Sequence, residues 1–173
     1  SCMFRYNKSM EKGTKENEMT KRMVFTMGLP GSGKSTVVND RYAPHGYAII
    51  DPDLFKVTHP DYDPKDTSIV HDWSMDMAEE AFKNALTTDG LWVVDGTGVN
   101  AERMVRRINE AKAVGYDVSL VYVKVSVETA LIRNAERPRS VPDALIISKA
   151  RDIDTSFAII EPHCDAVLTI KND

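Results

Sequence analysis

The feature that most constrains the fold of this chain is the octapeptide from Gly28 to Ser35, which reads Gly-Leu-Pro-Gly-Ser-Gly-Lys-Ser. It satisfies the pattern Gly-x-x-x-x-Gly-Lys-Ser/Thr, in which a glycine-rich turn joins a buried strand to a helix. The apolar run at 23–27 predicts the strand, and residues 34–41 are predicted to form the helix. Because the pattern arises by chance in roughly half a percent of chains of this length, we interpret it as a phosphate-binding loop.

The glycines of this loop allow backbone N–H groups to turn inward and form a concave anion site at the start of a helix. We expect the Lys34 ammonium to reach the β- and γ-phosphates of a nucleoside triphosphate, and the Ser35 hydroxyl to bind Mg²⁺. The predicted cofactors are therefore ATP and Mg²⁺. The loop residues predicted to hold ATP are Gly31, Ser32, Gly33, Lys34, Ser35 and Thr36.

The rest of the chain alternates short apolar runs with amphipathic segments. Further strands are predicted at 47–50, 91–94, 118–125 and 167–170, and helices at 53–57, 67–86, 100–115, 127–134 and 142–157. Strands that are apolar throughout and alternate with helices indicate a parallel sheet covered on both faces. We predict an α/β fold of the P-loop kinase type, with five parallel strands and helices on both faces. Thr67 or Ser68 can cap the long helix at 67–86, and Pro142 suits the first turn of the last one.

Length and composition favour one globular domain. The chain has 173 residues, of which 42% are hydrophobic and 28% are charged. Residues 1–20 are polar, so we expect a flexible N-terminal segment that is not a secretory signal, followed by the kinase domain at 21–173. No apolar run approaches the length of a membrane span, and the two cysteines lie far apart, so we expect a cytoplasmic protein. The net charge of −4 argues against a generically basic nucleic-acid binder and leaves a local basic groove open.

Acidic residues follow two of the predicted strands. Asp51 closes the second strand, Asp53 comes two residues later, and Asp95 closes the third. The carboxyl ends of parallel strands are where such sheets bind ligands. Asp53 can act as the base for an acceptor hydroxyl or only cap the following helix. Asp95 is expected to hold a Mg²⁺-bound water rather than only begin a turn, and Thr97 can contact an acceptor or stabilise that turn.

Three arginines, Arg133, Arg137 and Arg139, lie within seven residues across a predicted helix end and a proline-containing loop. Guanidinium groups match the charge that phosphoryl transfer spreads over the γ-phosphoryl oxygens. We therefore favour a short arginine-rich lid over an ordinary solvated loop, with Arg137 and Arg139 contacting ATP.

Other basic residues carry weaker signals. Lys56 can meet an acceptor phosphate or remain a surface lysine, and both interpretations stay open. The side chains of Arg103, Arg106 and Arg107 are expected to face solvent from a helix.

Several segments together resemble the kinase domain of 5′-polynucleotide kinases, over residues 21 to about 157. They are Gly28 to Thr36, Asp51-Pro52-Asp53, Asp95, and Leu131 to Arg137 through Val141-Pro142. The resemblance implies that Asp53 activates the acceptor hydroxyl and that Arg133 and Arg137 are lid arginines with catalytic roles. Lys56 stands where that family has an arginine for the acceptor phosphate, which weakens the case for the same acceptor.

A second resemblance involves the zeta-toxin kinases. Residues 50–56, continuing through 59–63, and the segment Asp95-Gly96-Thr97-Gly98 are similar to that family, which usually has glutamate in place of Asp95. Those enzymes phosphorylate a UDP-amino sugar, and the resemblance again implies a base at Asp53. Phage kinases that act on hydroxymethyl-pyrimidines in DNA belong to the same broad group and fit a compact chain.

We therefore predict a kinase that transfers the γ-phosphate of ATP to a hydroxyl on nucleic acid, either a 5′ end or a hydroxymethyl-pyrimidine. One alternative is a kinase of UDP-sugars or other small molecules. The other is a switch or binding module that only hydrolyses its nucleotide.

Overall fold

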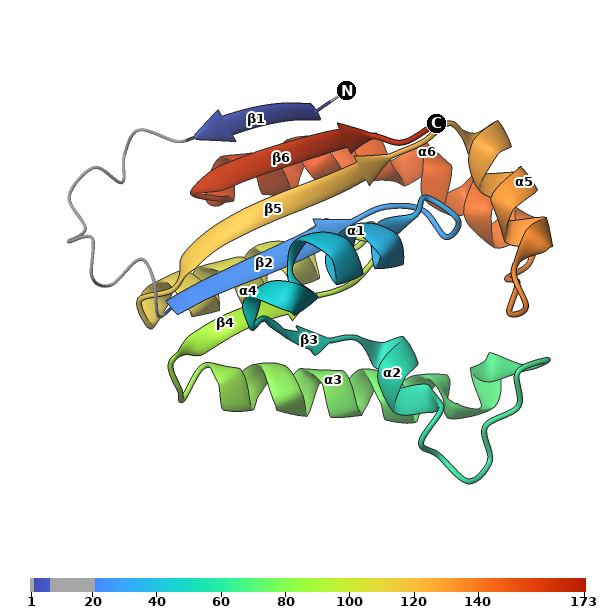
Figure 1. Ribbon diagram of the computed structural model, residues 1–173, viewed down its shortest axis with the longest axis horizontal. Helices are drawn as coiled ribbons and strands as arrows, with labels where there is room; N and C mark the ends of the chain where they lie inside the picture. The colour runs from blue at the N-terminus through green and yellow to red at the C-terminus, as the bar shows by residue number, and fades with distance from the viewer. Residues whose placement is uncertain (1, 7–20) are drawn as a thin grey trace.

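The structure of the protein is a computed structural model that describes residues 2–6 and 21–173. Its strands form one sheet in the order β1-β6-β5-β2-β4-β3 (Figure 1). Neighbouring strands are parallel except β1 and β6, which pair antiparallel. The strands are β1 (Cys2–Tyr6), β2 (Lys21–Met27), β3 (Ala48–Ile50), β4 (Gly90–Val94), β5 (Asp117–Lys124) and β6 (Ala166–Lys171). The predicted five-stranded parallel sheet is confirmed, and the structure adds β1 at its edge.

Helices cover both faces of this sheet, as the alternation of elements predicts. Figure 1 shows α1 in front of the sheet and α4 and α6 behind it. The α-helices are α1 (Lys34–Arg41), α2 (Pro52–Lys56), α3 (His71–Ala85), α4 (Ala101–Ala113), α5 (Val127–Glu136) and α6 (Asp143–Ile160). Short 3₁₀ turns are η3 (Ala43–His45), η4 (Thr67–Val70) and η5 (Glu161–His163). None of the helices in the described part of the chain has the length and apolar character needed to cross a membrane.

Two apolar cores lie on opposite faces of the sheet, because successive side chains of a strand point to opposite sides. Along β2, Met23 and Phe25 belong to the larger core, whereas Val24 belongs to the smaller core that includes α1. The Phe25 ring packs edge-on against Phe82 of α3, with 6.3 Å between ring centroids. The parallel strands are therefore held from both sides, and their carboxyl ends lie together at the right in Figure 1.

The starts of two helices differ from the sequence prediction. The segment predicted as one helix at 67–86 begins as η4, and the Asp66 carboxylate accepts a hydrogen bond from the Ser68 N–H at 3.2 Å. The expectation that Thr67 or Ser68 caps this segment is wrong, because the N-cap position falls one residue earlier, where the Asp66 side chain accepts the hydrogen bond. Pro142 is the N-cap of α6 rather than a residue of its first turn.

The start of the chain also differs from expectation. The sequence predicts a flexible segment at 1–20, yet Cys2–Tyr6 form β1, in which Cys2 lies opposite Ile170 of β6. This pairing satisfies backbone N–H and C=O groups that β6 would otherwise present at the sheet edge. Residues 1 and 7–20, on which the rest of this prediction falls, lie outside the described residues.

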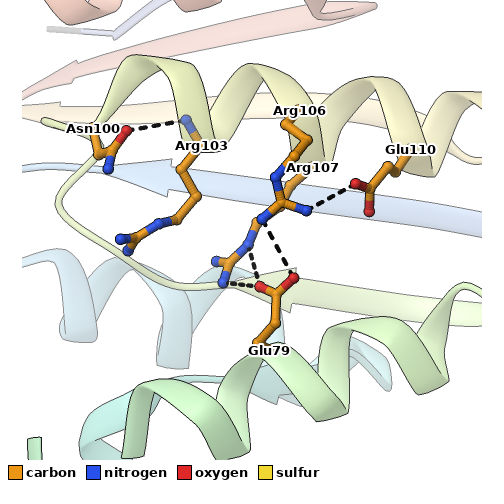
Figure 2. A network of polar contacts seen from close by, with 6 residues as sticks. All are labelled: Glu79, Asn100, Arg103, Arg106, Arg107 and Glu110. Atoms are coloured by element: carbon orange, nitrogen blue, oxygen red, sulfur yellow. Dashed lines mark hydrogen bonds and ion pairs between the residues drawn. The ribbon is translucent and has the colours of Figure 1, made fainter. Parts of the chain in front are cut away.

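An ion-pair network links α3 to α4 (Figure 2). The Arg107 side chain is only 14% exposed, and its Nε donates to Glu79 Oε2 at 3.0 Å. The Arg107 guanidinium also lies 5.5 Å from the Phe82 ring centroid. The expectation of a solvent-facing side chain is wrong for Arg107, whereas Arg103, one turn earlier, is exposed. The error arises because helical periodicity gives a residue's face but not the glutamate on the neighbouring helix.

We expect Arg107→Met to lower the free energy of unfolding at pH 7 by about 1–2 kcal/mol, because it removes a partly buried ion pair. Burial would raise the pKa of Glu79, but hydrogen bonds and charge from Arg107 and Arg106 lower it overall. A lowered carboxyl pKa contributes stability above the ordinary value of 4.5 that is lost as pH falls through the folded value. Urea denaturation should therefore show the deficit shrinking below pH 4.5, and Arg103→Met is the matched control. A deficit as large in the control would contradict this account.

Candidate active site

Two glycines of the loop between β2 and α1 occupy backbone positions at which other residues would be strained. Gly31 and Gly33 have φ angles of 84° and 87°, in the left-handed region that favours glycine. A Cβ atom at residue 31 would lie 2.6 Å from the carbonyl oxygen of Ala130 in α5. At residue 33 it would collide with Nδ2 of Asn172, just after β6. The loop is therefore packed from outside and keeps the backbone shape that a phosphate cradle requires.

Ser32 occupies the centre of this loop. The residue is 1% exposed, and its hydroxyl has no hydrogen-bond partner among the described residues. Its carbonyl oxygen, in contrast, accepts hydrogen bonds from Asn172 Nδ2 at 2.8 Å and Arg133 Nη1 at 3.4 Å. A buried hydroxyl without a partner costs free energy. A phosphate oxygen in the loop is an acceptor of the kind this hydroxyl lacks.

Lys34 connects the loop to the acidic end of β4. Its Nζ lies 3.5 Å from Oδ1 of the largely buried Asp95. The Thr26 hydroxyl of β2 donates to the same carboxylate and accepts from the Gly96 N–H at 3.2 Å. Thr97, one residue further, accepts a hydrogen bond from the Gly28 N–H at its carbonyl oxygen, at 3.1 Å. The phosphate loop and the end of β4 therefore form one continuous site.

Asp51 is the N-cap of α2, and its carboxylate accepts from the Asp53 N–H at 2.9 Å. Burial and then repulsion from the Asp95 carboxylate raise the pKa of Asp51 to about 6. Two carboxylates therefore lie within electrostatic reach, and one of them resists ionisation. This is the environment in which a divalent cation or a shared proton is favoured.

The N-cap of α2 is Asp51 and not Asp53, and the interpretation of Asp53 as only a helix cap is therefore wrong. Its side chain is 48% exposed and is approached by two cations, Lys56 and Arg139. Lys56 Nζ lies 3.4 Å from Oδ1, and Arg139 Nη2 lies 3.6 Å from Oδ2. Lys56 is itself only 8% exposed, so it is not a surface lysine. Asp53 is thus an accessible carboxylate held between two positive charges.

The three arginines of the predicted lid have different surroundings. Arg133 is fixed to backbone, because its Nη2 donates to the Asn172 carbonyl oxygen at 2.7 Å besides its bond to Ser32. Arg137 is the C-cap of α5 and is half-buried. Arg139 reaches the acceptor side, where its Nη1 donates to the Tyr62 hydroxyl at 3.4 Å. The sequence pattern places them close together but does not distinguish these environments.

The segment that carries Arg137 and Arg139 is closed by one buried asparagine. Asn134 Nδ2 donates to the Val141 carbonyl oxygen at 2.7 Å, and its Oδ1 accepts from the Val141 N–H at 3.0 Å. Both ends of the segment are therefore tied together by this one side chain.

Sequence reasoning missed Lys149, and it gave His71 only a weak signal near the predicted acceptor side. Lys149 lies on α6, and burial together with the charges of Lys34 and Lys56 lowers its pKa, an effect that Asp53 opposes. Burial and then the charge of Lys56 lower the pKa of His71, at the start of α3. Both residues thus face the same cluster of charges. Neither stands in a motif, and only the packing of α3 and α6 brings them to the strand ends.

The donor groups of the site fit Mg²⁺ bound jointly with ATP. No group of three or more His, Cys, Asp or Glu side chains in residues 2–6 and 21–173 is placed to hold a metal by itself. Mg²⁺ usually takes one or two protein ligands and completes its shell with phosphates and waters. Ser35, exposed beside Thr36 in the first turn of α1, offers a hydroxyl, and Asp95 offers a carboxylate. The repulsion between Asp51 and Asp95 would be relieved by a nearby cation.

Comparison with protein families identifies the group to which this site belongs. The chain matches the family model described as Zeta toxin over residues 7–173. It belongs to the zeta toxin family. No curated protein matches the chain in sequence. Membership of the zeta toxin family, together with the P-loop kinase fold, supports a phosphotransferase. The resemblance to polynucleotide kinases of the phage type remains a prediction.

Solved structures share the fold at low sequence identity. A structure from the PezAT chromosomal toxin–antitoxin system of Streptococcus pneumoniae has 18% identity and a TM-score of 0.73, covering 95% of this chain and 71% of that one. AvrRxo1-ORF1:AvrRxo1-ORF2 with ATP has 17% identity and a TM-score of 0.59, covering 84% and 52%. The Pnkp1/Rnl/Hen1 RNA repair complex has 16% identity and a TM-score of 0.62, covering 87% and 48%. The chain thus spans about half the length of the last two proteins.

We expect Asp51→Asn to raise the free energy of unfolding at pH 7.5 by about 2 kcal/mol. The folded pKa of Asp51 lies near 6, above the ordinary value of 3.8, so ionisation destabilises the folded state as pH rises between these two values. Asparagine removes this cost and still caps α2. The gain should disappear near pH 4 in urea denaturation, and Asp76→Asn, on the exposed side of α3, is the control. A variant that is no more stable than wild type at pH 7.5 would contradict the assignment.

Proposed function

We propose that this member of the zeta toxin family transfers the γ-phosphoryl group of ATP to a hydroxyl group of an acceptor bound beside Asp53. The observation that carries the proposal is the arrangement around the strand ends. The loop lysine Lys34 contacts Asp95, while Asp53 stands a short distance along the same rim, between Lys56 and Arg139. The donor side, with Lys34 and Asp95, therefore adjoins the acceptor side, with Asp53, Lys56 and Arg139.

On the donor side, the loop amides, the Ser32 hydroxyl and the Lys34 ammonium bind the ATP phosphates. Ser35 and Asp95 are the residues proposed to hold Mg²⁺, Asp95 through a bound water. When bound, this ion supplies positive charge that screens the phosphates. The ATP-bound AvrRxo1-ORF1 complex, which shares the fold, is consistent with this donor.

On the acceptor side, Asp53 is the proposed base. Its carboxylate takes the proton of the acceptor hydroxyl as that oxygen forms a bond to the γ-phosphorus. The bond between the γ-phosphorus and the β–γ bridging oxygen breaks, and ADP leaves with the electron pair. The exposure of the Asp53 side chain leaves room for an acceptor, and Thr97 is proposed to contact it.

Positive side chains are proposed to stabilise the charge that develops on the transferred group. Arg137 and Arg139 stand in the segment closed by Asn134, and Lys149 faces Lys34 and Asp53 from α6. Arg133 supports the loop through backbone carbonyl groups in this structure, and it is proposed to act with these residues from that position.

The acceptor is proposed to carry a phosphate of its own. Two cations, Lys56 and Arg139, are paired with the one accessible carboxylate of Asp53, so the positive side chains outnumber the negative one at this point. A nucleotide sugar, the acceptor class implied by the resemblance to zeta-toxin kinases, presents such a phosphate. The hydroxyl on nucleic acid that the sequence favoured has the same chemistry, but the net charge of −4 and the family membership favour the small molecule.

The acceptor class is tested with γ-labelled ATP and a panel of UDP-sugars, single-stranded DNA, RNA and hydroxymethyl-pyrimidine DNA. We expect the labelled product among the UDP-sugars and not on the polynucleotides. A labelled polynucleotide would contradict the small-molecule assignment and restore the acceptor that the sequence favoured.

Asp53→Asn should lower the rate of phosphoryl transfer by about 10²–10⁴-fold, because it removes the proposed base without changing the side-chain shape. ATP affinity, measured by calorimetry, should stay within about threefold of wild type, since the donor contacts remain. Asp61→Asn, in the exposed loop after α2, is the matched control and should transfer at the wild-type rate. Near-wild-type transfer by Asp53→Asn would remove Asp53 as the base.

A further inference from the structure

The peptide group between Ser32 and Gly33 is held from outside the loop. Asn172 Nδ2 donates to the Ser32 carbonyl oxygen at 2.8 Å, and Arg133 Nη1 donates to the same oxygen at 3.4 Å. Arg133 also donates to the Asn172 carbonyl oxygen at 2.7 Å. These three hydrogen bonds join the loop, α5 and the end of β6 in a closed triangle.

The hydrogen bonds to the Ser32 carbonyl oxygen determine the direction of the Gly33 N–H group. A peptide unit is planar and normally trans, so its C=O and N–H point in opposite directions. Because the Ser32 carbonyl points outward to Asn172, the Gly33 N–H of the same unit points toward the inside of the loop. That is the side on which a phosphate must lie to meet the loop amides.

We infer that Asn172 is a positioning residue for the donor phosphates, which it serves by holding the Ser32–Gly33 peptide in its phosphate-binding orientation. The inference rests on the proposed function, because it assumes that this loop binds ATP. Asn172 need not touch the nucleotide. It acts through the backbone, and Arg133 acts with it from α5.

Two further features support this role. The Asn172 N–H donates to the Lys124 carbonyl oxygen at 2.9 Å, so the residue is anchored to the end of β5. Its Nδ2 also occupies the space that a Cβ at residue 33 would fill, which makes Gly33 and Asn172 mutually dependent. A rigid strand end, rather than another mobile loop, therefore sets the shape of the cradle.

The test is ATP affinity, measured by calorimetry, in Asn172→Leu, which keeps the side-chain shape and removes the donor. We expect the dissociation constant to rise about tenfold, as for one lost hydrogen bond in a binding site. Asn172→His, which keeps an N–H at a similar reach, should bind within about threefold of wild type. Asn109→Leu, the same change on the exposed side of α4, should bind ATP as wild type does. The urea midpoint without ATP should be unchanged in all three variants.

Other results would overturn the role proposed for Asn172. Wild-type affinity in Asn172→Leu, or equal losses in the leucine and histidine variants, would overturn the inference while the proposed function stood. A large fall in the urea midpoint of Asn172→Leu would show a general structural role and overturn it too. Failure of the wild-type chain to bind ATP would instead overturn the proposed function, and this inference with it.

Discussion

The site depends on one constraint, the packing of the glycine loop against three neighbouring segments of the chain. Gly28 approaches the Val123 carbonyl oxygen of β5, Gly31 approaches Ala130 of α5, and Gly33 approaches Asn172 after β6. A loop of this composition is flexible in isolation, because glycine loses the most conformational freedom on folding. The contacts replace that freedom with one shape, so that inward-pointing amides meet a phosphate without a further ordering cost.

The second constraint is electrostatic. Parallel strands covered on both faces place their carboxyl ends at one rim, and the sequence puts Asp51 and Asp95 there, near Lys34. Burying two carboxylates within reach of each other is costly, as the raised pKa of Asp51 indicates. A fold under selection for stability alone would use other side chains at these positions. Perturbed carboxylate pKa values of this kind are typical of functional sites, which agrees with the proposal that a cation and phosphates bind here.

Much of the fold and of the phosphate loop was predictable from sequence, because both depend on local patterns of residues. Apolar runs of strand length fix the five parallel strands, and the glycine motif fixes the turn after β2. The helix caps were misjudged by one or two residues, whereas the errors in side-chain environment have another cause, which is that the partners come from distant segments. Helical periodicity predicts that the Arg107 side chain faces solvent, but it donates a hydrogen bond to Glu79 of α3. No pattern along α4 indicates that a glutamate of another helix lies there. Lys149 and Asn172 were likewise missed, since only the packing of α6 and β6 brings them to the loop.

The central claim is that ATP is a phosphoryl donor, so that its γ-phosphoryl group is transferred to an acceptor hydroxyl rather than to water. Phosphorus NMR of the wild-type protein with ATP, Mg²⁺ and a mixture of UDP-sugars follows the γ-phosphorus directly. The account predicts a new phosphomonoester resonance that grows in step with ADP and stays absent from the same mixture without protein. ADP accompanied only by inorganic phosphate would contradict it, and would make the chain a nucleotide hydrolase.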